Sequence, residues 1–176
     1  PAYGETEMRF LFAIIIACML VSHVEAAERA RVSLPVIRPL TFESIVHAAS
    51  RYDVPLAPLL GILATENGRL GEALGNKNGT WDLGPFQVNT CHLNDLSEIG
   101  FTPEAIMSDG PVNALAAAWL LRQEIERAGH LWHGVGHYHS RTPFRKYGYI
   151  RKVRSNIGIL KRDGLKSLPI HWEEKL

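Results

Sequence analysis

Apolar and polar residues alternate at helical spacing along much of this chain, and proline, glycine and asparagine mark the breaks. The first amphipathic stretch covers residues 42–51, follows Thr41 as a capping residue and ends ahead of Pro55, which predicts a helix. The next stretch, residues 58–66, is apolar almost throughout and closes on Glu66. It predicts a buried helix with a single carboxylate in its last turn.

A different pattern follows this second helix. Residues 68–89 are rich in glycine and asparagine and predict a loop with short strands around 82–88. Further helices are expected from Pro103, over 112–128, near 131–138 and, behind a cap at Ser140 or Thr142, from Pro143 to about Leu160. The pattern as a whole predicts a single domain that is mainly α with a small β element.

The N-terminal part has the pattern of an export signal. Residues 10–21 form a short apolar run behind Met8-Arg9, too short for a stable membrane anchor. We expect cleavage after Ala26 and a location in the periplasm of a Gram-negative cell. The chain then divides into an upstream extension and signal peptide at 1–26, a linker at 27–40, a folded domain at 41–162 and an irregular tail at 163–176.

The two cysteines lead to different expectations. An alternative to simple cleavage makes residues 15–18 a lipoprotein cleavage box, in which Cys18 is acylated and tethers the protein to a membrane. Cleavage after Ala26 leaves Cys91 as the only cysteine, which excludes a disulfide within one chain. We expect Cys91 to be a buried packing residue and not a nucleophile.

The position of Glu66 suggests acid–base chemistry. Apolar neighbours and the negative end of the helix dipole both disfavour its ionised form, so its pKa should be raised toward neutrality. A stretch that follows, residues 79–89, supplies an aromatic ring, a carboxamide and an asparagine, which are residue types that bind sugars. Asp82 lies in this stretch and is either a second carboxylate, as most glycosidases have, or a turn cap. Together these features favour a glycan-cleaving site.

These residues also resemble a known family. A helix that ends in Glu66, the segment Gly84-Pro85-Phe86-Gln87-Val88-Asn89 and a later tyrosine-rich helical region are similar to the soluble lytic transglycosylase domain, a lysozyme-like fold that cleaves peptidoglycan. The resemblance covers roughly residues 41–155 and is closest to the small forms that accompany conjugation and type IV secretion machinery. The chain departs from the family pattern at Asn67, at Pro85-Phe86 and at residues 138–140.

The resemblance implies a mechanism and a set of residues. Glu66 would act as acid and then as base on the MurNAc-β-1,4-GlcNAc bond, with help from the substrate's N-acetyl group, to leave 1,6-anhydro ends. Gln87 and Asn89 would line the substrate groove, although they could equally satisfy the hairpin backbone. Tyr138 matches the tyrosine that bonds the catalytic glutamate, Tyr149 matches a later aromatic near the floor of the site, and His139 replaces a groove asparagine.

Two other functions stay open from the sequence. A hydrolytic muramidase would use water positioned by Asp82, and a non-catalytic module would bind peptidoglycan in an assembly without cleaving it. Four histidines within ten residues, His130, His133, His137 and His139, have spacings that suit a zinc site. Because no cysteine or carboxylate accompanies them, we expect no metal and no cofactor.

Charge adds a candidate for a partner. Basic and acidic residues nearly balance, at 19 and 18, but residues 141–162 contain eight basic side chains and no acid. Such a face suits the carboxylates of peptidoglycan, a phospholipid surface or a nucleic acid, and an ordinary solvated helix can have the same composition. We expect peptidoglycan strands as the partner, together with components of an envelope secretion or conjugation apparatus. We expect neither nucleic acid binding nor stable membrane insertion.

Overall fold

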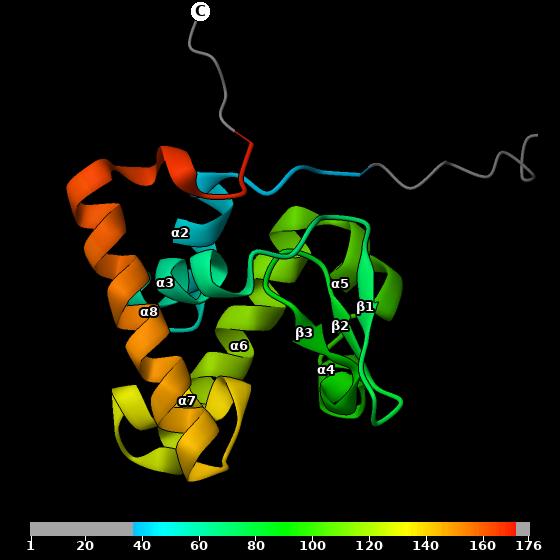
Figure 1. Cartoon of the computed structure of the whole chain (residues 1–176). Coiled ribbons are helices and arrows are strands. Elements are labelled where there is room, and N and C mark those ends of the chain that lie inside the picture. The colour runs from blue at the N-terminus through cyan, green and yellow to red at the C-terminus, as the bar shows by residue number, and fades with distance from the viewer. Residues whose placement is uncertain (1–36, 172–176) are drawn as a thin grey trace, which may run out of the picture. The chain divides into compact units, whose positions relative to one another are not determined.

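The computed structural model describes residues 37–171, so the expectations for the signal peptide, for Cys18 and for most of the linker lie outside the described residues. The helices of this part are α2 (Phe42–Arg51), α3 (Leu56–Glu66), α4 (Leu93–Glu98), α5 (Pro103–Ser108), α6 (Gly110–Ala128), α7 (Leu131–His139) and α8 (Pro143–Asp163). The strands are β1 (Ala73–Gly75), β2 (Trp81–Leu83) and β3 (Val88–Asn89), and 3-10 turns cover Thr90–His92 and Leu165–Ser167. Figure 1 shows their arrangement.

The helix ends follow the signals in the sequence. Thr41 and Ser44 form a capping box at the start of α2, and the Asp109 side chain accepts the Val112 amide, 3.1 Å away, at the start of α6. Gly129 ends α6 in the left-handed conformation, with a φ of 64°. Thr142 stands at the N-cap of α8 without a side-chain bond, and its backbone amide donates to Ser140 Oγ over 3.2 Å.

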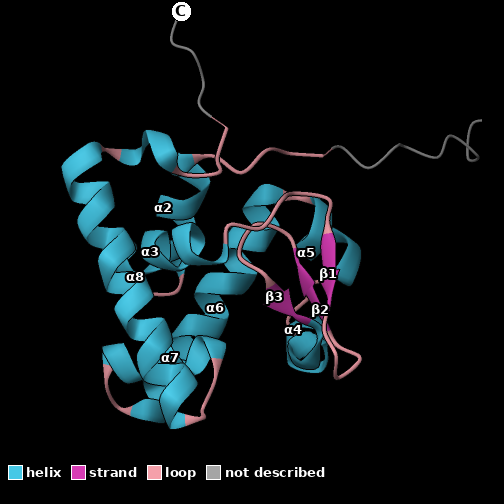
Figure 2. Ribbon diagram, viewed as in Figure 1, coloured by secondary structure: helices cyan, strands magenta, loops and turns pink. Residues whose placement is uncertain are grey.

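The β element is a three-stranded antiparallel sheet in the order β1-β2-β3. Leu74 pairs with Asp82, and Asp82 pairs with Asn89, so the aspartate occupies the middle of the sheet. Figure 2 shows the strands gathered on the side of the molecule away from α8. The expected fold class, mainly α with a small β element, is confirmed. The sequence pattern did not predict β1, α4 or the 3-10 turn before it.

Helix α6 lies at the centre of the core. It packs against α2, α5 and α7, and α8 packs against α3 and α7. Alanines on α6, which are small enough for close approach, are fully buried at positions 114, 116, 117 and 118. The opposite wall of the core is the apolar run of α3, in which Leu59, Ile62 and Leu63 have no exposed surface. Glu66 follows this run and is therefore held at a fixed place beside the sheet.

Gly61 allows α3 and α8 to approach closely. A Cβ added at this position would lie 2.7 Å from Ile157 Cγ1 and 2.9 Å from Val153 Cγ1 on α8. On the same pair of helices, Asn156 Nδ2 donates to Thr65 Oγ1 over 3.0 Å. This close packing brings the groove-facing side of α8 within hydrogen-bond distance of the end of α3.

We expect Gly61→Ala to lower the free energy of unfolding by about 1–3 kcal/mol, because β-branched side chains on α8 have little freedom to move aside. Gly158→Ala is the matched control: it is also a helical glycine, its added Cβ meets nothing within 4 Å, and it should stabilise the protein by about 0.5–1 kcal/mol. Urea unfolding of both variants measures the difference. Equal effects would mean that Gly61 does not set the helix separation.

The segment after α8 is more ordered than its sequence predicts. Leu168 is 5% exposed and belongs to the core, and the His171 amide donates to the Leu40 carbonyl over 2.7 Å. Thr41 and His171 form a parallel bridge, so residues 168–171 lie beside the segment that leads into α2. Burial of one leucine and this backbone pairing fix a segment that has no periodic pattern. None of the helices between residues 37 and 171 is both long and apolar enough to cross a membrane.

Candidate functional site

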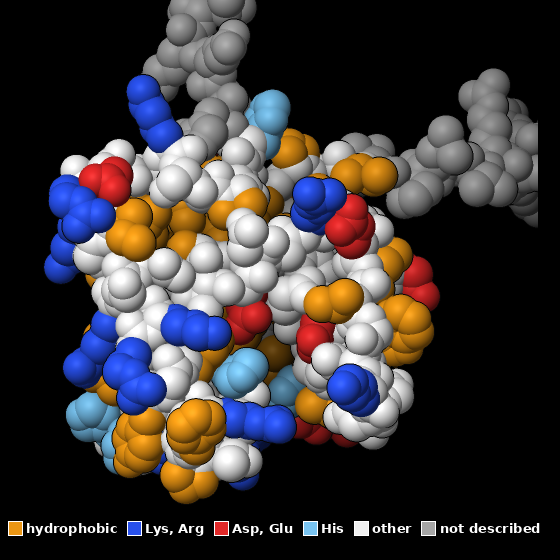
Figure 3. All heavy atoms as spheres, viewed as in Figure 1, with side chains coloured by type: hydrophobic (Ala, Val, Ile, Leu, Met, Phe, Trp, Pro, Cys, Tyr) orange, Lys and Arg blue, Asp and Glu red, His pale blue; other side chains and the backbone are white. Residues whose placement is uncertain are grey.

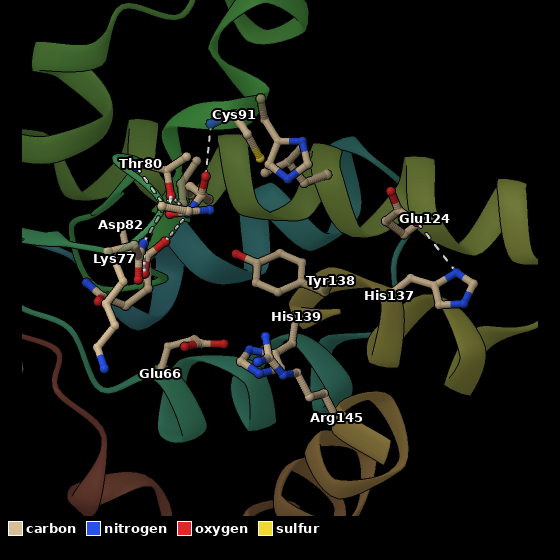
Figure 4. A pocket seen from close by; sticks show the side chains of 17 residues that line it. Glu66, Lys77, Thr80, Asp82, Cys91, Glu124, His137, Tyr138, His139 and Arg145 are labelled. Atoms are coloured by element: carbon tan, nitrogen blue, oxygen red, sulfur yellow. Dashed lines mark hydrogen bonds and ion pairs between the residues drawn. The ribbon is translucent and has the colours of Figure 1, made fainter. Parts of the chain in front are cut away.

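A groove of about 660 Å³ runs between the sheet and the helices. Figure 4 shows Glu66 on one side of it, with Asp82 and Lys77 on the sheet side, Tyr138 and His139 from α7, and Arg145 from α8. Its remaining lining consists of Asn76, Asn78, Thr80, Gln87, Val88, Asn89, Cys91, His92, Leu120, Glu124 and His137. Polar side chains therefore dominate the groove.

Glu66 has the raised pKa that its sequence position predicts. The pKa of this carboxyl is raised to about 7: burial has the largest effect and the charge of Asp82 acts in the same direction, while Tyr149 and Lys152 lower it. The helix ends directly after it because Asn67 adopts the left-handed conformation, with a φ of 48°. Asparagine tolerates this conformation well, which accounts for Asn67 at a position where the family pattern has serine.

The tyrosine that holds Glu66 is Tyr149 and not Tyr138. Tyr149 is 4% exposed, and its hydroxyl donates to Glu66 Oε1 over 2.6 Å. The Tyr138 hydroxyl instead donates to the Phe86 carbonyl, 3.0 Å away, and so supports the turn between β2 and β3. The resemblance assigns the hydrogen bond with Glu66 to Tyr138, and this assignment is wrong. The close packing of α3 and α8 places Tyr149 next to the glutamate instead.

Asp82 is fixed by the carboxamides of two neighbours. Asn76 Nδ2 donates to Asp82 Oδ2 over 2.8 Å, and Asn89 Nδ2 donates to Asp82 Oδ1 over 2.6 Å. Asn89 also donates to Thr80 Oγ1 and accepts the Cys91 amide, so all of its amide group is engaged. Asp82 thus links β2 to β3 and to the loop that follows β1, and it does not act as the turn cap that the sequence also allowed.

Gln87 and Asn89 combine the two roles that the sequence left open. Both line the groove, and both hold loop backbone. Gln87 has a φ of 49°, and its Nε2 donates to the Gly84 carbonyl over 2.8 Å. A Cβ on Gly68 would lie 2.3 Å from that same carbonyl oxygen, so only glycine fits at this position after Glu66. Binding of substrate by these amides stays a prediction.

Asn113 anchors the sheet to the helices, and the sequence analysis missed it. Its side chain on α6 is fully buried, and Nδ2 donates to the carbonyls of Leu83 (3.0 Å) and Ile106 (2.8 Å). Its Oδ1 accepts the Phe86 amide over 2.9 Å. The sequence signal for this role is a lone asparagine among the alanines of a helix face. A buried carboxamide requires hydrogen-bond partners for its polar atoms, so such an asparagine indicates a contact with another element.

The groove histidines are shifted toward their neutral forms. The His139 ring stacks on Tyr149 with centroids 4.7 Å apart, and burial, together with Lys152 and Arg145, lowers its pKa. Burial also lowers the pKa of His92 and of His137. Because His139 is stacked on the tyrosine that holds Glu66, its protonation would place a positive charge close to Glu66, and we expect this to begin at a lower pH than for an ordinary histidine.

The four histidines near residue 135 point to different partners. His130 and His133 lie together with ring centroids 5.3 Å apart, His137 lies 3.6 Å from Glu124, and His139 stacks on Tyr149. Within residues 37–171 no three histidine, cysteine or acidic side chains gather as metal ligands would. The described part of the chain therefore has no arrangement of side chains that would support a zinc site. The expectation of no metal stays a prediction.

Glu124 is a buried acid that the sequence analysis did not single out. It is 4% exposed, and its carboxylate accepts from Arg127 (2.7 Å) and Arg141 (3.0 Å). The Arg127 bond lies within α6, and the Arg141 bond joins α6 to the loop between α7 and α8. A buried carboxylate with two arginines is a structural element that fixes where α8 begins, and hence where Tyr149 lies.

Cys91 is exposed, which contradicts the expectation of a buried thiol. The residue lies in the 3-10 turn after β3, where its amide is bonded to Asn89, and it borders the groove. Partial burial and the charges of Asp82 and Asp95 raise the pKa of the Cys91 thiol. The thiolate is thereby disfavoured, which agrees with the view that Cys91 is not a nucleophile.

Comparison with known proteins finds bacterial relatives at modest identity. The chain is 33% identical over 100 residues to protein IpgF of Shigella flexneri, an alignment that covers 56% of this chain and 66% of IpgF. It is 26% identical over 122 residues to the invasion protein IagB of Salmonella typhimurium, which covers 66% of this chain and 76% of IagB. No model of a known protein family matches the chain.

The chain spans just under two thirds of the length of IpgF. The name of IagB connects that relative with invasion, and the name of IpgF specifies no activity. The similarity to IpgF and IagB agrees in general terms with the resemblance to the lytic transglycosylase domain.

Proposed function

We propose that this protein is a lytic transglycosylase, which cleaves the MurNAc-β-1,4-GlcNAc bond of peptidoglycan without water and leaves 1,6-anhydro-MurNAc ends. The observation that supports this most is Glu66, a carboxyl with a pKa of about 7 in a polar groove. One group can serve first as acid and then as base only if its pKa lies near the working pH. An ordinary glutamate would be ionised almost completely at neutrality.

The reaction needs only one carboxyl from the protein. The protonated Glu66 gives its proton to the glycosidic oxygen while the N-acetyl carbonyl oxygen of MurNAc attacks the anomeric carbon and the glycosidic bond breaks. The Glu66 carboxylate then takes the proton of the MurNAc 6-hydroxyl, whose oxygen displaces the N-acetyl oxygen from the anomeric carbon. The proton count returns to its start, and no water is consumed. Tyr149 keeps Oε1 in place throughout, because its donor hydroxyl fixes one carboxyl oxygen.

The hydrolytic alternative depends on Asp82, which lies in the same groove. Both of its oxygens accept amide N–H groups from asparagines, an arrangement that suits a structural carboxylate better than a base that orients water. Product analysis by mass spectrometry of digested sacculi tests the choice. Anhydro ends support the lytic reaction, reducing ends support a muramidase, and intact glycan supports a binding module without catalysis.

Tyr149→Phe and Asp82→Asn should shift the pH profile in opposite directions. Loss of the Tyr149 hydrogen bond removes a stabiliser of the Glu66 anion, so its pKa rises above about 7 and activity persists to higher pH. Asp82→Asn removes a neighbouring negative charge, so the pKa of Glu66 falls and activity is lost at lower pH. The alkaline limb of kcat/KM measures both shifts. Shifts of the same sign in both variants would contradict this role of Glu66.

We further propose that the protein works in the periplasm and opens the cell wall locally for a conjugation or secretion apparatus. Similarity to a protein named for invasion supports the association with secretion. Mass spectrometry of the processed chain is expected to find Ala27 at the N-terminus. A diacylglyceryl group on Cys18 would instead place the protein on a membrane as a lipoprotein.

A further inference from the structure

Helix α8 presents three different faces. Ile150, Val153 and Leu160 are buried in the core. Tyr149 bonds to Glu66 and Asn156 bonds to Thr65, so a second face follows the groove side of α3. The third face consists of Phe144, Tyr147, Arg151 and Arg154, whose spacings of three and four residues place them in one row along the helix. We call this row the outer stripe; neither the core nor the groove uses it.

The outer stripe combines exposed aromatic rings with fixed cations. Phe144 is 86% exposed, the highest value for any large apolar side chain in the described part of the chain, and Tyr147 is 48% exposed. The Arg154 guanidinium lies 4.2 Å from the ring centroid of Trp132 on α7, and Lys146 Nζ lies 4.8 Å from that of Tyr147. His133 meets the edge of Tyr147 at 6.5 Å. The side chains of the stripe are thus arranged side by side over α7 and α8.

The cations of the stripe lack acidic partners within residues 37–171. Nearby acids form ion pairs with other cations: Glu124 with Arg127 and Arg141, Glu126 with Arg122, and Asp163 with Arg162. Neither Arg151 nor Arg154 forms an ion pair in that part of the chain. Figure 3 shows Lys and Arg side chains along the edge of the molecule over α8, and hydrophobic and histidine side chains at the end where α7 and α8 meet.

We infer that the outer stripe docks the protein on a membrane surface rich in anionic phospholipid. Guanidinium and ammonium groups bind lipid phosphates, and aromatic side chains lie at the depth of the headgroups in a bilayer. A soluble polyanion would match the cations, but it offers no apolar layer for Phe144. The contact is peripheral and reversible, since it uses one side of one helix. It is independent of the reaction proposed for the groove.

Sedimentation with vesicles tests this inference. The processed protein, with its N-terminus checked by mass spectrometry, is mixed with vesicles of phosphatidylcholine or of phosphatidylcholine with 30% phosphatidylglycerol, roughly the anionic content of a bacterial membrane. We expect binding to the anionic vesicles alone, with a loss in high salt. Phe144→Ala with Arg151→Gln should lower the partition coefficient by at least about 5-fold, the contribution of one cation near such a surface.

A second double variant controls for general loss of charge and apolar surface. Leu74→Ser with Lys77→Gln removes one exposed apolar and one basic side chain from the sheet side, and it should bind vesicles as the unchanged protein does. Thermal unfolding checks that both variants remain folded. Equal binding to both kinds of vesicle, equal losses in both double variants, or binding to soluble polyglutamate but not to vesicles would overturn the inference.

Discussion

Replacement of Glu66 by Gln is expected to lower the rate of muropeptide release by at least about 10²-fold, the usual loss when a general acid–base group is removed. Glutamine has the same size and can still accept the Tyr149 hydroxyl proton, so the hydrogen bond of 2.6 Å should survive. The side chain can no longer give a proton to the glycosidic oxygen. Release of anhydro-muropeptides from purified sacculi measures the effect.

The same variant should be more stable than the unchanged protein at alkaline pH. The folded-state pKa of Glu66, about 7, lies above the unfolded value of 4.5, so folding favours the protonated form. That stability is complete below pH 4.5 and is lost as the pH rises through 7. The free energy of unfolding of Glu66→Gln, compared with that of the unchanged protein, should therefore rise by up to about 3 kcal/mol between pH 4 and pH 8. This value follows from 1.36 kcal/mol per pKa unit.

Glu72→Gln is the matched control for both readouts, because Glu72 is exposed and forms only a surface ion pair with Arg69. It should change neither muropeptide release nor the dependence of stability on pH. If Glu66→Gln kept nearly full activity, Glu66 would be removed from the mechanism. If it lost activity without any change in the stability profile, the raised pKa of Glu66 would be wrong while its chemical role could stand.

Asn113→Ala is expected to lower the free energy of unfolding by about 3 kcal/mol or more. The change removes three buried hydrogen bonds and leaves the Phe86 amide and the Leu83 and Ile106 carbonyls without their partner. Each unsatisfied buried group costs about 1–3 kcal/mol, although water that enters the space left by the side chain reduces the sum. Urea unfolding at constant pH measures the loss.

Asn94→Ala is a suitable control, since Asn94 is an exposed asparagine on α4, and its side chain holds no other element. It should change stability by less than about 0.5 kcal/mol. We expect Asn113→Ala also to lower activity at temperatures where the protein is still folded, because the turn that carries Gln87 is held by this side chain. Stability close to that of the control would show that the sheet is anchored elsewhere.

Most of the helices and the acid could be predicted from local chemistry. Thr41, Asp109 and Gly129 are local helix signals, and an apolar run that ends in a glutamate predicts a buried carboxyl with a raised pKa. The short strand β1 was not predictable in the same way. Its residues are all exposed, so burial imposes no pattern on its sequence.

The partners within the site depend on packing between distant elements. Tyr149 reaches Glu66, 83 positions earlier in the chain, because Gly61 lets α3 and α8 come close. The sequence around either residue does not show that the two side chains lie within hydrogen-bond distance. The family resemblance correctly predicted that a tyrosine bonds to Glu66, but it assigned this role to Tyr138 and not to Tyr149. Cys91 was expected inside because lone thiols are usually buried, and the turn that Asn89 caps places it at the groove instead.

The three faces of α8 also limit how this chain can change in length during evolution. A helix turns by about 100° per residue, so a single residue inserted between Tyr149 and Val153 would rotate everything after it by that angle. Val153 would leave the core, and Asn156 would lose Thr65. Relatives should therefore keep the spacing from Tyr149 to Asn156 without gaps.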